Sequence, residues 1–237
     1  METLQKTPVP FDDTYVLYDP TDPLSFICAG LSLLPIGILC FYLSWFIVTR
    51  ELEPCIMACG QVFNDVLNNI VKNHVKHPRP RVFEGFQQNG LRSGYGMPSA
   101  HAQFMGFFFT YLTLRLWLQW RGLTTTRRLC GTLALATVSC SVIFARVYLH
   151  YHSVPQVVVG TCIGSSLGVT FFFIGTMART TGLTNWVLSW SISDFLSLKD
   201  TCFFQPESLA EQRNQWLNRR QQQLQHPSSS SSSSKVE

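Results

Sequence analysis

Charged side chains are scarce in this chain of 237 residues. Only 14% of the residues are Asp, Glu, Lys or Arg, against about 25% in an average soluble protein, whereas 46% are hydrophobic. This shortage of charge argues against an ordinary water-soluble domain, and no nucleic-acid partner is expected. Because the length suits one domain with tails, we expect an all-α, multi-pass transmembrane helical bundle.

Paired cysteines and metal-binding clusters are also lacking. The eight cysteines lie mostly within apolar runs, where a thiol behaves as a small hydrophobic group. Cys55 and Cys59 have no second pair that would complete a metal site. We therefore expect no disulfide framework, no metal and no cofactor. A cleavable signal peptide is not evident either, because residues 1–23 are acidic and the first apolar run is too long for one.

Long hydrophobic runs, in contrast, are plentiful. A helix that crosses a bilayer needs about 20 mostly apolar residues, and four runs qualify: residues 24–48, 103–120, 129–149 and 154–177. A fifth segment, residues 57–73, is two-faced at helical spacing, with Asn64 and Asn68 on its polar face. We expect it to cross the membrane with that face turned into the bundle, because polar groups are costly in lipid. A helix that lies at the membrane surface is the alternative.

The C-terminal part of the chain differs from this core. Residues 183–198 are amphipathic and rich in aromatic side chains, so we expect residues 178–205 to form either an interfacial segment or a sixth span. Residues 206–237 are polar and include a run of serines. We expect this tail to be disordered, because it cannot bury a core.

Polar clusters interrupt the apolar runs at three places. The first contains Lys72 and Arg79, seven residues apart, and Pro78 and Pro80 end the helix there. Two cations at a membrane–water boundary suit a phosphate group, since arginine offers a bidentate fork and lysine a point charge. The alternative is a positive flank that anchors the helix to lipid headgroups.

The second and third clusters each contain a histidine. Ser99 and His101 follow Pro98 at the start of an apolar run, where serine is a favourable N-cap and free helix amides bind anions. A capping serine with an incidental histidine is the alternative there. In the third cluster, Arg146 ends an apolar run and His152 follows six residues later. A snorkelling arginine would also explain Arg146.

The three clusters lie on one membrane face if residues 57–73 cross the membrane. Three cations, two histidines and a helix N-terminus without a carboxylate then describe a phosphate-binding site. Two histidines allow one nucleophile and one general acid. The converging residues are Lys72, Arg79, Ser99, His101, Arg146 and His152.

The order of the clusters, K-x6-RP, PS-x-H and R-x5-H, resembles the signature of the type-2 phosphatidic acid phosphatase and haloperoxidase superfamily. The motifs span residues 72–156, and their flanks, YGMPSAHAQF and ARVYLHYHSVPQV, are most similar to members that act on dolichyl diphosphate. The resemblance implies a metal-independent hydrolase in which His152 attacks phosphorus and His101 protonates the leaving oxygen. It also implies that the phosphate is held by Lys72, Arg79, Ser99 and Arg146.

The chain departs from the superfamily pattern at two positions. Ala145 replaces a serine before the third-motif arginine, and Gln156 replaces an aspartate four residues after the histidine. No Asp occurs between Asp65 and Asp194, so we expect Gln156 to orient His152 by accepting a hydrogen bond. A neutral orienting group fits a diphosphate better than a monoester, because a phosphate leaving group, with a second pKa of about 6, departs more easily than an alkoxide.

The expected membrane topology follows from loop charges. The loop between residues 120 and 129 carries Arg121, Arg127 and Arg128, and basic loops favour the cytoplasm. We therefore expect a luminal tail at residues 1–23, followed by a phosphatase domain at residues 24–177 with its catalytic rim in the lumen. The resemblance implies that this is the lumen of the endoplasmic reticulum, where the enzyme would return dolichyl phosphate to the pool used for protein N-glycosylation.

Other functions stay open. A broad lipid phosphate phosphatase acting on phosphatidate-like monoesters would use the same residues. A non-enzymatic lipid-phosphate binder or transporter would keep the cations without needing both histidines. A vanadate haloperoxidase fits less well, because such relatives are mostly soluble. The partners expected are a polyprenyl diphosphate substrate and the lipid bilayer, and no obligate protein partner is inferred.

Overall fold

The computed structural model describes residues 16–80, 94–120, 122–202 and 209–225. In these ranges helices dominate, no strand is formed, and one isolated bridge joins Glu51 and Lys199. The chain divides into two compact units, residues 1–202 and residues 203–237, and each is described by itself. The expected all-helical architecture is confirmed.

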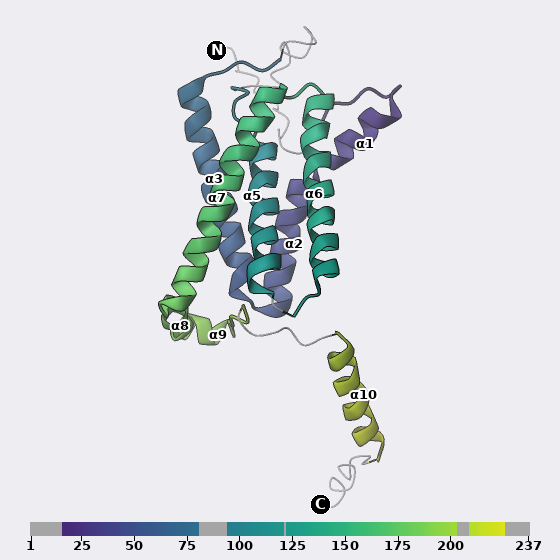
Figure 1. Cartoon of the computed structure of the whole chain (residues 1–237), viewed down its shortest axis with the longest axis vertical. Helices are drawn as coiled ribbons and strands as arrows, with labels where there is room; N and C mark the ends of the chain where they lie inside the picture. Colours follow the sequence, from purple (N-terminus) through teal and green to yellow (C-terminus); the bar gives the residue numbers. More distant parts are fainter. Residues whose placement is uncertain (1–15, 81–93, 121, 203–208, 226–237) are drawn as a thin grey trace, which may run out of the picture. The chain divides into compact units, whose positions relative to one another are not determined.

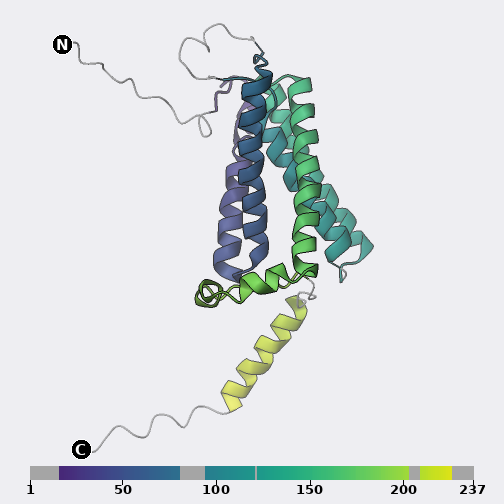
Figure 2. The same cartoon turned by 90° about the vertical axis from the view of Figure 1, so that its left-hand side faces the viewer.

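The first unit is a bundle of long helices that run between two ends (Figures 1 and 2). Its long elements are α1 (Pro23–Leu31), α2 (Leu34–Thr49), α3 (Leu52–Val75), α5 (Ala100–Leu114), the π-helical turn η1 (Arg115–Gln119), α6 (Thr125–Tyr148) and α7 (Val154–Thr180). The end at which α3 and α6 finish and α5 and α7 begin is called the upper end here, as in Figure 1. Among the described residues, Pro23–Thr49, Thr125–Tyr148 and Val154–Thr180 are long and apolar enough to cross a membrane by composition alone.

Helix α3 is the two-faced segment that the sequence predicted. Gln61, Asn64 and Asn68 are each at most 3% exposed, whereas Val66 and Ile70 are more than half exposed. The helix therefore turns its polar face into the bundle and its apolar face outward, as membrane burial requires. The prediction of an inward polar face is confirmed, and the crossing of the membrane by this helix stays a prediction.

Buried amide side chains join α3 to α5. Gln103 donates through Nε2 to Oδ1 of Asn64 at 2.8 Å, and Asn68 donates through Nδ2 to Oε1 of Gln103 at 2.7 Å. Gln61 donates to the carbonyl of Phe104 at 3.2 Å. These bonds give partners to polar groups that lipid cannot satisfy. They also set the register that brings Lys72, one turn beyond Asn68, to the upper end.

Helices α5 and α7 pack backbone against backbone along a row of glycines. A Cβ atom at Gly160 would lie 2.6 Å from the carbonyl oxygen of Ser99, and one at Gly164 would lie 1.9 Å from that of Gln103. Gly168 continues the row one turn further. Small residues at four-residue spacing let helix backbones approach closely in membranes. The glycine row thus sets how the starts of α5 and α7 lie against each other.

A buried ionic cluster closes the lower end. Glu53 is 1% exposed and forms ion pairs with Arg115 and Arg179. Arg179 also pairs with Asp200 at 2.7 Å. Two cations thus face two carboxylates, which offsets the cost of removing these charges from water. Arg115, which the sequence allowed either to snorkel or to face the bundle, faces the bundle.

Residues 183–198 form two short helices at the lower end, α8 (Leu183–Leu188) and α9 (Ser191–Phe195) (Figure 1). Their lengths of six and five residues are far below the roughly 20 residues of a membrane-crossing helix. The sixth-span alternative is therefore wrong. The interfacial interpretation stays a prediction, and the exposed side chains of Trp186 and Phe195 suit it.

The second unit contains helix α10 (Leu209–Gln225). The expectation of disorder from residue 206 onward is therefore wrong for this stretch. Its composition showed that it cannot bury a core, but leucine, alanine, glutamate, glutamine and arginine are good helix formers, and neither glycine nor proline interrupts them. The serine run lies outside the described residues.

The glycine row predicts the effect of one added methyl group. Gly164→Ala should destabilise the protein by about 1–3 kcal/mol, as overpacking does, because the new Cβ meets backbone atoms of α5. The measurement is the Tm of the detergent-purified protein. Gly37→Ala is the matched control, since a Cβ on that helical glycine meets nothing within 4 Å. Equal Tm values for the two variants would contradict the close approach.

Candidate active site

The six predicted phosphate-site residues occupy helix ends at the upper end of the bundle. Lys72 lies in the last turn of α3, and Arg79 follows in the segment after it. Ser99 and His101 lie at the start of α5. Arg146 lies in the last turn of α6, and His152 lies in the connection between α6 and α7. The three clusters, far apart in sequence, thus meet on one face as predicted.

His152 experiences the field of the surrounding cations. It is 4% exposed, and burial lowers its pKa well below the ordinary value of 6.5. The charges of Arg79, Arg146 and Lys72 lower this pKa further, and the same cations lie within electrostatic reach of His101. At neutral pH His152 is therefore uncharged, which is the form a nitrogen nucleophile needs.

The connection between α6 and α7 folds back onto the end of α6. The carbonyl of Arg146 accepts hydrogen bonds from the amides of Tyr151 at 3.0 Å and His152 at 3.1 Å. His150 makes this reversal possible with a left-handed φ of 55°. The guanidinium of Arg146 lies 4.0 Å from the centre of the Tyr151 ring, a cation–π contact. This turn holds the arginine and the histidine of the R-x5-H motif together.

A backbone carbonyl orients His152. Its Nδ1 lies 2.9 Å from the carbonyl oxygen of Gly96. Because a carbonyl only accepts, Nδ1 carries the proton, and Nε2 keeps the free lone pair. A Cβ on Gly96 would lie 2.6 Å from Nε2 of Gln156 and 3.0 Å from Cγ of Arg79. Glycine is therefore the residue that fits here, and Nε2 is the candidate attacking atom.

The predicted contact between Gln156 and His152 is wrong, because both ends of the Gln156 amide are engaged elsewhere. Oε1 accepts from the amide of Ser153 at 3.1 Å in the capping box of α7. Nε2 donates to the carbonyl of Pro78 at 2.8 Å. Gln156 thus fastens the segment that carries Arg79 to the start of α7, and the orienting contact belongs to Gly96.

Helix α5 begins inside the site, as the sequence predicted. Ser99 is its N-cap, and the Ser99 amide donates to the carbonyl of Gln156 at 3.1 Å. The Ser99 hydroxyl makes no capping bond and is buried without a partner among the described residues. A buried hydroxyl without a partner is costly, and a phosphate oxygen would satisfy it. The amides of the first turn of α5 add the positive end of the helix.

A pocket of about 340 Å³ lies beside His101, between α2, α3 and α5. Its α2 wall is apolar, with Pro35, Ile36 and Leu39, whereas the α3 wall includes the amide of Asn64 and the carboxylate of Asp65. His101 is itself one of the residues that line the pocket. A molecule with a polar head at the histidines could place the start of an apolar tail here.

Backbone carbonyls position both histidines of the site. The carbonyl of Gly96 contacts His152, and the carbonyl of Ser32 lies 3.1 Å from Nε2 of His101. Residue types give little warning of such contacts, although a glycine two residues before the PS-x-H motif is a signal for Gly96. The other departure from the superfamily pattern, Ala145, is fully buried beside Leu149 and Tyr151, so its side chain packs in a hydrophobic cluster.

Comparison with known proteins identifies the family of this chain. The family described as the PAP2 superfamily matches residues 53–180, which run from the first turn of α3 to the end of α7. Dolichyldiphosphatase of Saccharomyces cerevisiae is 50% identical over 204 residues, which are 86% of this chain and 85% of the yeast protein. Dolichyldiphosphatase 1 of Mus musculus is 34% identical over 194 residues, 79% of this chain and 80% of the mouse protein. Lipid phosphate phosphatase gamma of Arabidopsis thaliana is 33% identical over 168 residues, 68% of this chain and 71% of the plant protein. No solved structure gives a significant match.

The contacts of Gln156 predict the effect of a carboxylate at this position. Gln156→Glu keeps the oxygen that caps α7 but turns a negative oxygen toward the carbonyl of Pro78, which displaces the segment carrying Arg79. We expect kcat/KM for phosphate release to fall about tenfold, corresponding to the roughly 1.4 kcal/mol typical of a lost buried hydrogen bond. Gln222→Glu on α10 adds the same charge elsewhere and should change nothing. Unchanged or higher activity in Gln156→Glu would mean that a carboxylate here supports His152 after all.

Proposed function

The chain belongs to the PAP2 superfamily, and from this premise we propose that it hydrolyses dolichyl diphosphate to dolichyl phosphate and phosphate. The observation that carries the proposal is His152, a buried, uncharged histidine whose Nδ1 is held by a backbone carbonyl within the field of three cations. The names of the yeast and mouse relatives support the choice of substrate.

In the first step, Nε2 of His152 attacks the terminal phosphorus. A nitrogen–phosphorus bond forms and the bond from this phosphorus to the bridging oxygen breaks. The electron pair leaves with dolichyl phosphate, and His101 supplies the proton for its oxygen. His101 must carry a positive charge to do so, and the negative charge of the bound diphosphate favours that form against burial and the cations that His101 shares with His152. Lys72, Arg79 and Arg146 hold the equatorial oxygens and stabilise the charge that develops on them.

In the second step, water hydrolyses the phosphohistidine. His101, now without its extra proton, takes a proton from the water as the water oxygen attacks phosphorus. The nitrogen–phosphorus bond breaks, and the lone pair returns to Nε2 of His152. Inorganic phosphate leaves, and both histidines regain their starting states, so the cycle needs neither a metal ion nor a cofactor.

A diphosphate suits this site better than a phosphate monoester. The group that orients His152 is a neutral carbonyl, so no carboxylate raises the basicity of the attacking nitrogen. A weaker nucleophile needs a better leaving group, and a phosphate monoester, with a second pKa of about 6, leaves far more readily than an alkoxide. The pocket beside His101, with its apolar α2 wall, supports a substrate whose phosphate is attached to a lipid.

The test of this proposal is phosphate release by detergent-purified protein in EDTA, with dolichyl diphosphate compared with phosphatidate. We expect EDTA-resistant turnover that favours the diphosphate. His152→Asn should lower kcat by at least about a thousandfold, because the nucleophile is lost. His150→Asn is the matched control, since asparagine tolerates its left-handed φ, and it should keep near-normal activity.

The outcomes separate the competing functions. A preference for phosphatidate would keep the mechanism but make the protein a general lipid phosphatase, as the name of the plant relative suggests for that protein. Absence of turnover with retained binding of dolichyl diphosphate would favour a binder or transporter. Equal losses in the two asparagine variants would contradict the role of His152.

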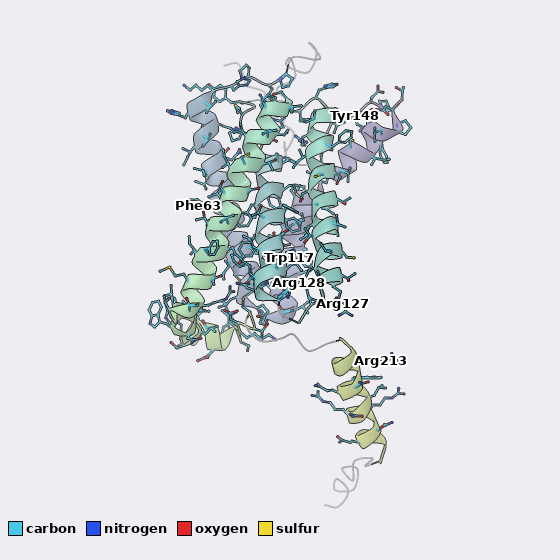
Figure 3. The ribbon with its side chains drawn as sticks, in the orientation of Figure 1. Phe63, Trp117, Arg127, Arg128, Tyr148 and Arg213 are labelled. Carbon is cyan, nitrogen blue, oxygen red and sulfur yellow. The ribbon has the colours of Figure 1, made fainter. Side chains whose placement is uncertain are left out.

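The proposal extends to the membrane in which the protein acts. We place the protein in the endoplasmic reticulum with the upper end in the lumen, where it returns dolichyl phosphate for protein N-glycosylation. Arg127 and Arg128 support this orientation, because they lie at the lower end of α6 (Figure 3), and basic loops favour the cytoplasm. Arg128 lies over Trp117, 5.9 Å from its ring centre, and aromatic residues favour membrane interfaces.

Glycosylation mapping tests the orientation. An Asn-x-Thr acceptor in a hydrophilic spacer inserted between residues 81 and 93 should be glycosylated in microsomes, because α3 ends and α5 begins at the upper end. The same spacer inserted at residue 122 should stay unmodified. Modification at residue 122 but not between residues 81 and 93 would show that the catalytic rim faces the cytoplasm.

A further inference from the structure

The first membrane span is broken beside the site. Helix α1 ends at Leu31 and α2 begins at Leu34, and the carbonyl of Ser32 at this break lies 3.1 Å from Nε2 of His101. Ser32 is fully buried, so its carbonyl needs a partner within the protein. The break between α1 and α2 therefore places a buried backbone acceptor against the histidine proposed as the general acid.

Proline explains why this carbonyl is available. In an unbroken helix the Ser32 carbonyl would accept from the amide of Ile36, but that amide donates to the carbonyl of Leu33 at 3.1 Å. The residue that a tighter 3₁₀ turn would use is Pro35, which has no N–H group. The backbone of α2 therefore leaves the Ser32 carbonyl to His101.

We infer that the break between α1 and α2 is a positioning device, in which the Ser32 carbonyl fixes the orientation and the tautomer of His101. Because the carbonyl only accepts, Nε2 carries a proton in both the neutral and the charged ring. Nδ1 is then the atom that gains and loses a proton. This role of Nδ1 in turnover rests on the proposed hydrolase function, whereas the tautomer does not.

The two histidines consequently use opposite nitrogens. A carbonyl holds Nδ1 of His152 and leaves Nε2 to attack phosphorus, whereas a carbonyl holds Nε2 of His101 and leaves Nδ1 for the leaving oxygen. In each ring, one nitrogen is held by a backbone carbonyl and the other nitrogen is available to the phosphate. Since the carbonyl accepts from the ring before and after proton transfer, the His101 ring need not rotate during the cycle.

The backbone of Ser32, rather than its side chain, makes this contact. The Ser32 hydroxyl donates to the carbonyl of Cys28 at 3.0 Å, so Ser32→Ala removes that bond and leaves the carbonyl in place. Pro35→Ala instead supplies an amide that competes for the Ser32 carbonyl. Pro54→Ala changes another proline, in the first turn of α3 and away from the site. These three variants separate the backbone contact from general effects of the substitutions.

The tautomer can be read directly in the full-length protein. With ¹⁵N-labelled histidine in detergent, the ring nitrogens of His101, assigned by their loss in His101→Gln, should show the proton on Nε2. The same pattern should persist in Ser32→Ala and Pro54→Ala. In Pro35→Ala we expect a mixture of tautomers. A proton on Nδ1 of His101 in the wild-type protein would overturn the inference whether or not the protein is active.

Kinetics provide the second readout. Pro35→Ala should lower kcat for dolichyl diphosphate about tenfold, because proton transfer suffers. KM is read separately, since Pro35 also lines the pocket beside His101. The loss should be larger for dolichyl monophosphate, whose alkoxide leaving group depends more on the proton. Ser32→Ala and Pro54→Ala should turn over both substrates normally. Equal losses of Pro35→Ala on both substrates, or kinetics of Pro35→Ala like those of Pro54→Ala, would overturn the positioning role. If the wild-type protein were inactive on every substrate, the proposed function would be overturned. The NMR result would then decide on the contact between Ser32 and His101 alone.

Discussion

The close approach of α5 and α7 is the constraint on which the site depends. Gly164 has no side chain where a Cβ would lie 1.9 Å from the backbone of α5, so the two helices touch through their main chains. One turn before, at Gly160, the contact reaches Ser99, whose amide bonds to the carbonyl of Gln156. The starts of two helices are thereby held side by side. Both helices begin at the upper end, so their positive ends lie there, which favours an anion.

Around this pair, polar contacts bring in the remaining site residues without adding a carboxylate. The amide chain through Asn68 and Gln103 holds α3 in register, and the Gln156 amide holds the segment after α3 by the carbonyl of Pro78. The buried carboxylates of Glu53 and Asp200 lie at the other end of the bundle, where they pair with arginines. Positive charge is thus concentrated at the phosphate end and neutralised at the opposite end. A phosphate entering the upper end meets cations and amides.

The sequence predicted those parts of the structure that residue types determine. Hydropathy predicted the helices, and the polar stripe of α3 predicted which face of that helix turns into the bundle. The order of the helices predicted that His101 and His152 lie at the same end of the bundle. The sequence did not predict contacts made by the backbone, such as the carbonyl of Gly96, because every residue has a carbonyl. It misassigned Gln156, because a side chain at the third position of a helix serves the helix cap first. It also missed α10, since helix propensity can act where no core forms.

The neutral carbonyl beside His152 gives a physical reason for the missing aspartate. A carboxylate at hydrogen-bonding distance would stabilise the imidazolium and raise the pKa of His152, opposing Arg79, Arg146 and Lys72. With a carbonyl, the pKa of His152 stays well below 6.5, and the free base is present even in mildly acidic solution. Lower basicity costs nucleophilic strength, which matters most when the leaving group is poor. A site that attacks the anhydride bond of a diphosphate tolerates this cost, because the departing phosphate needs little assistance.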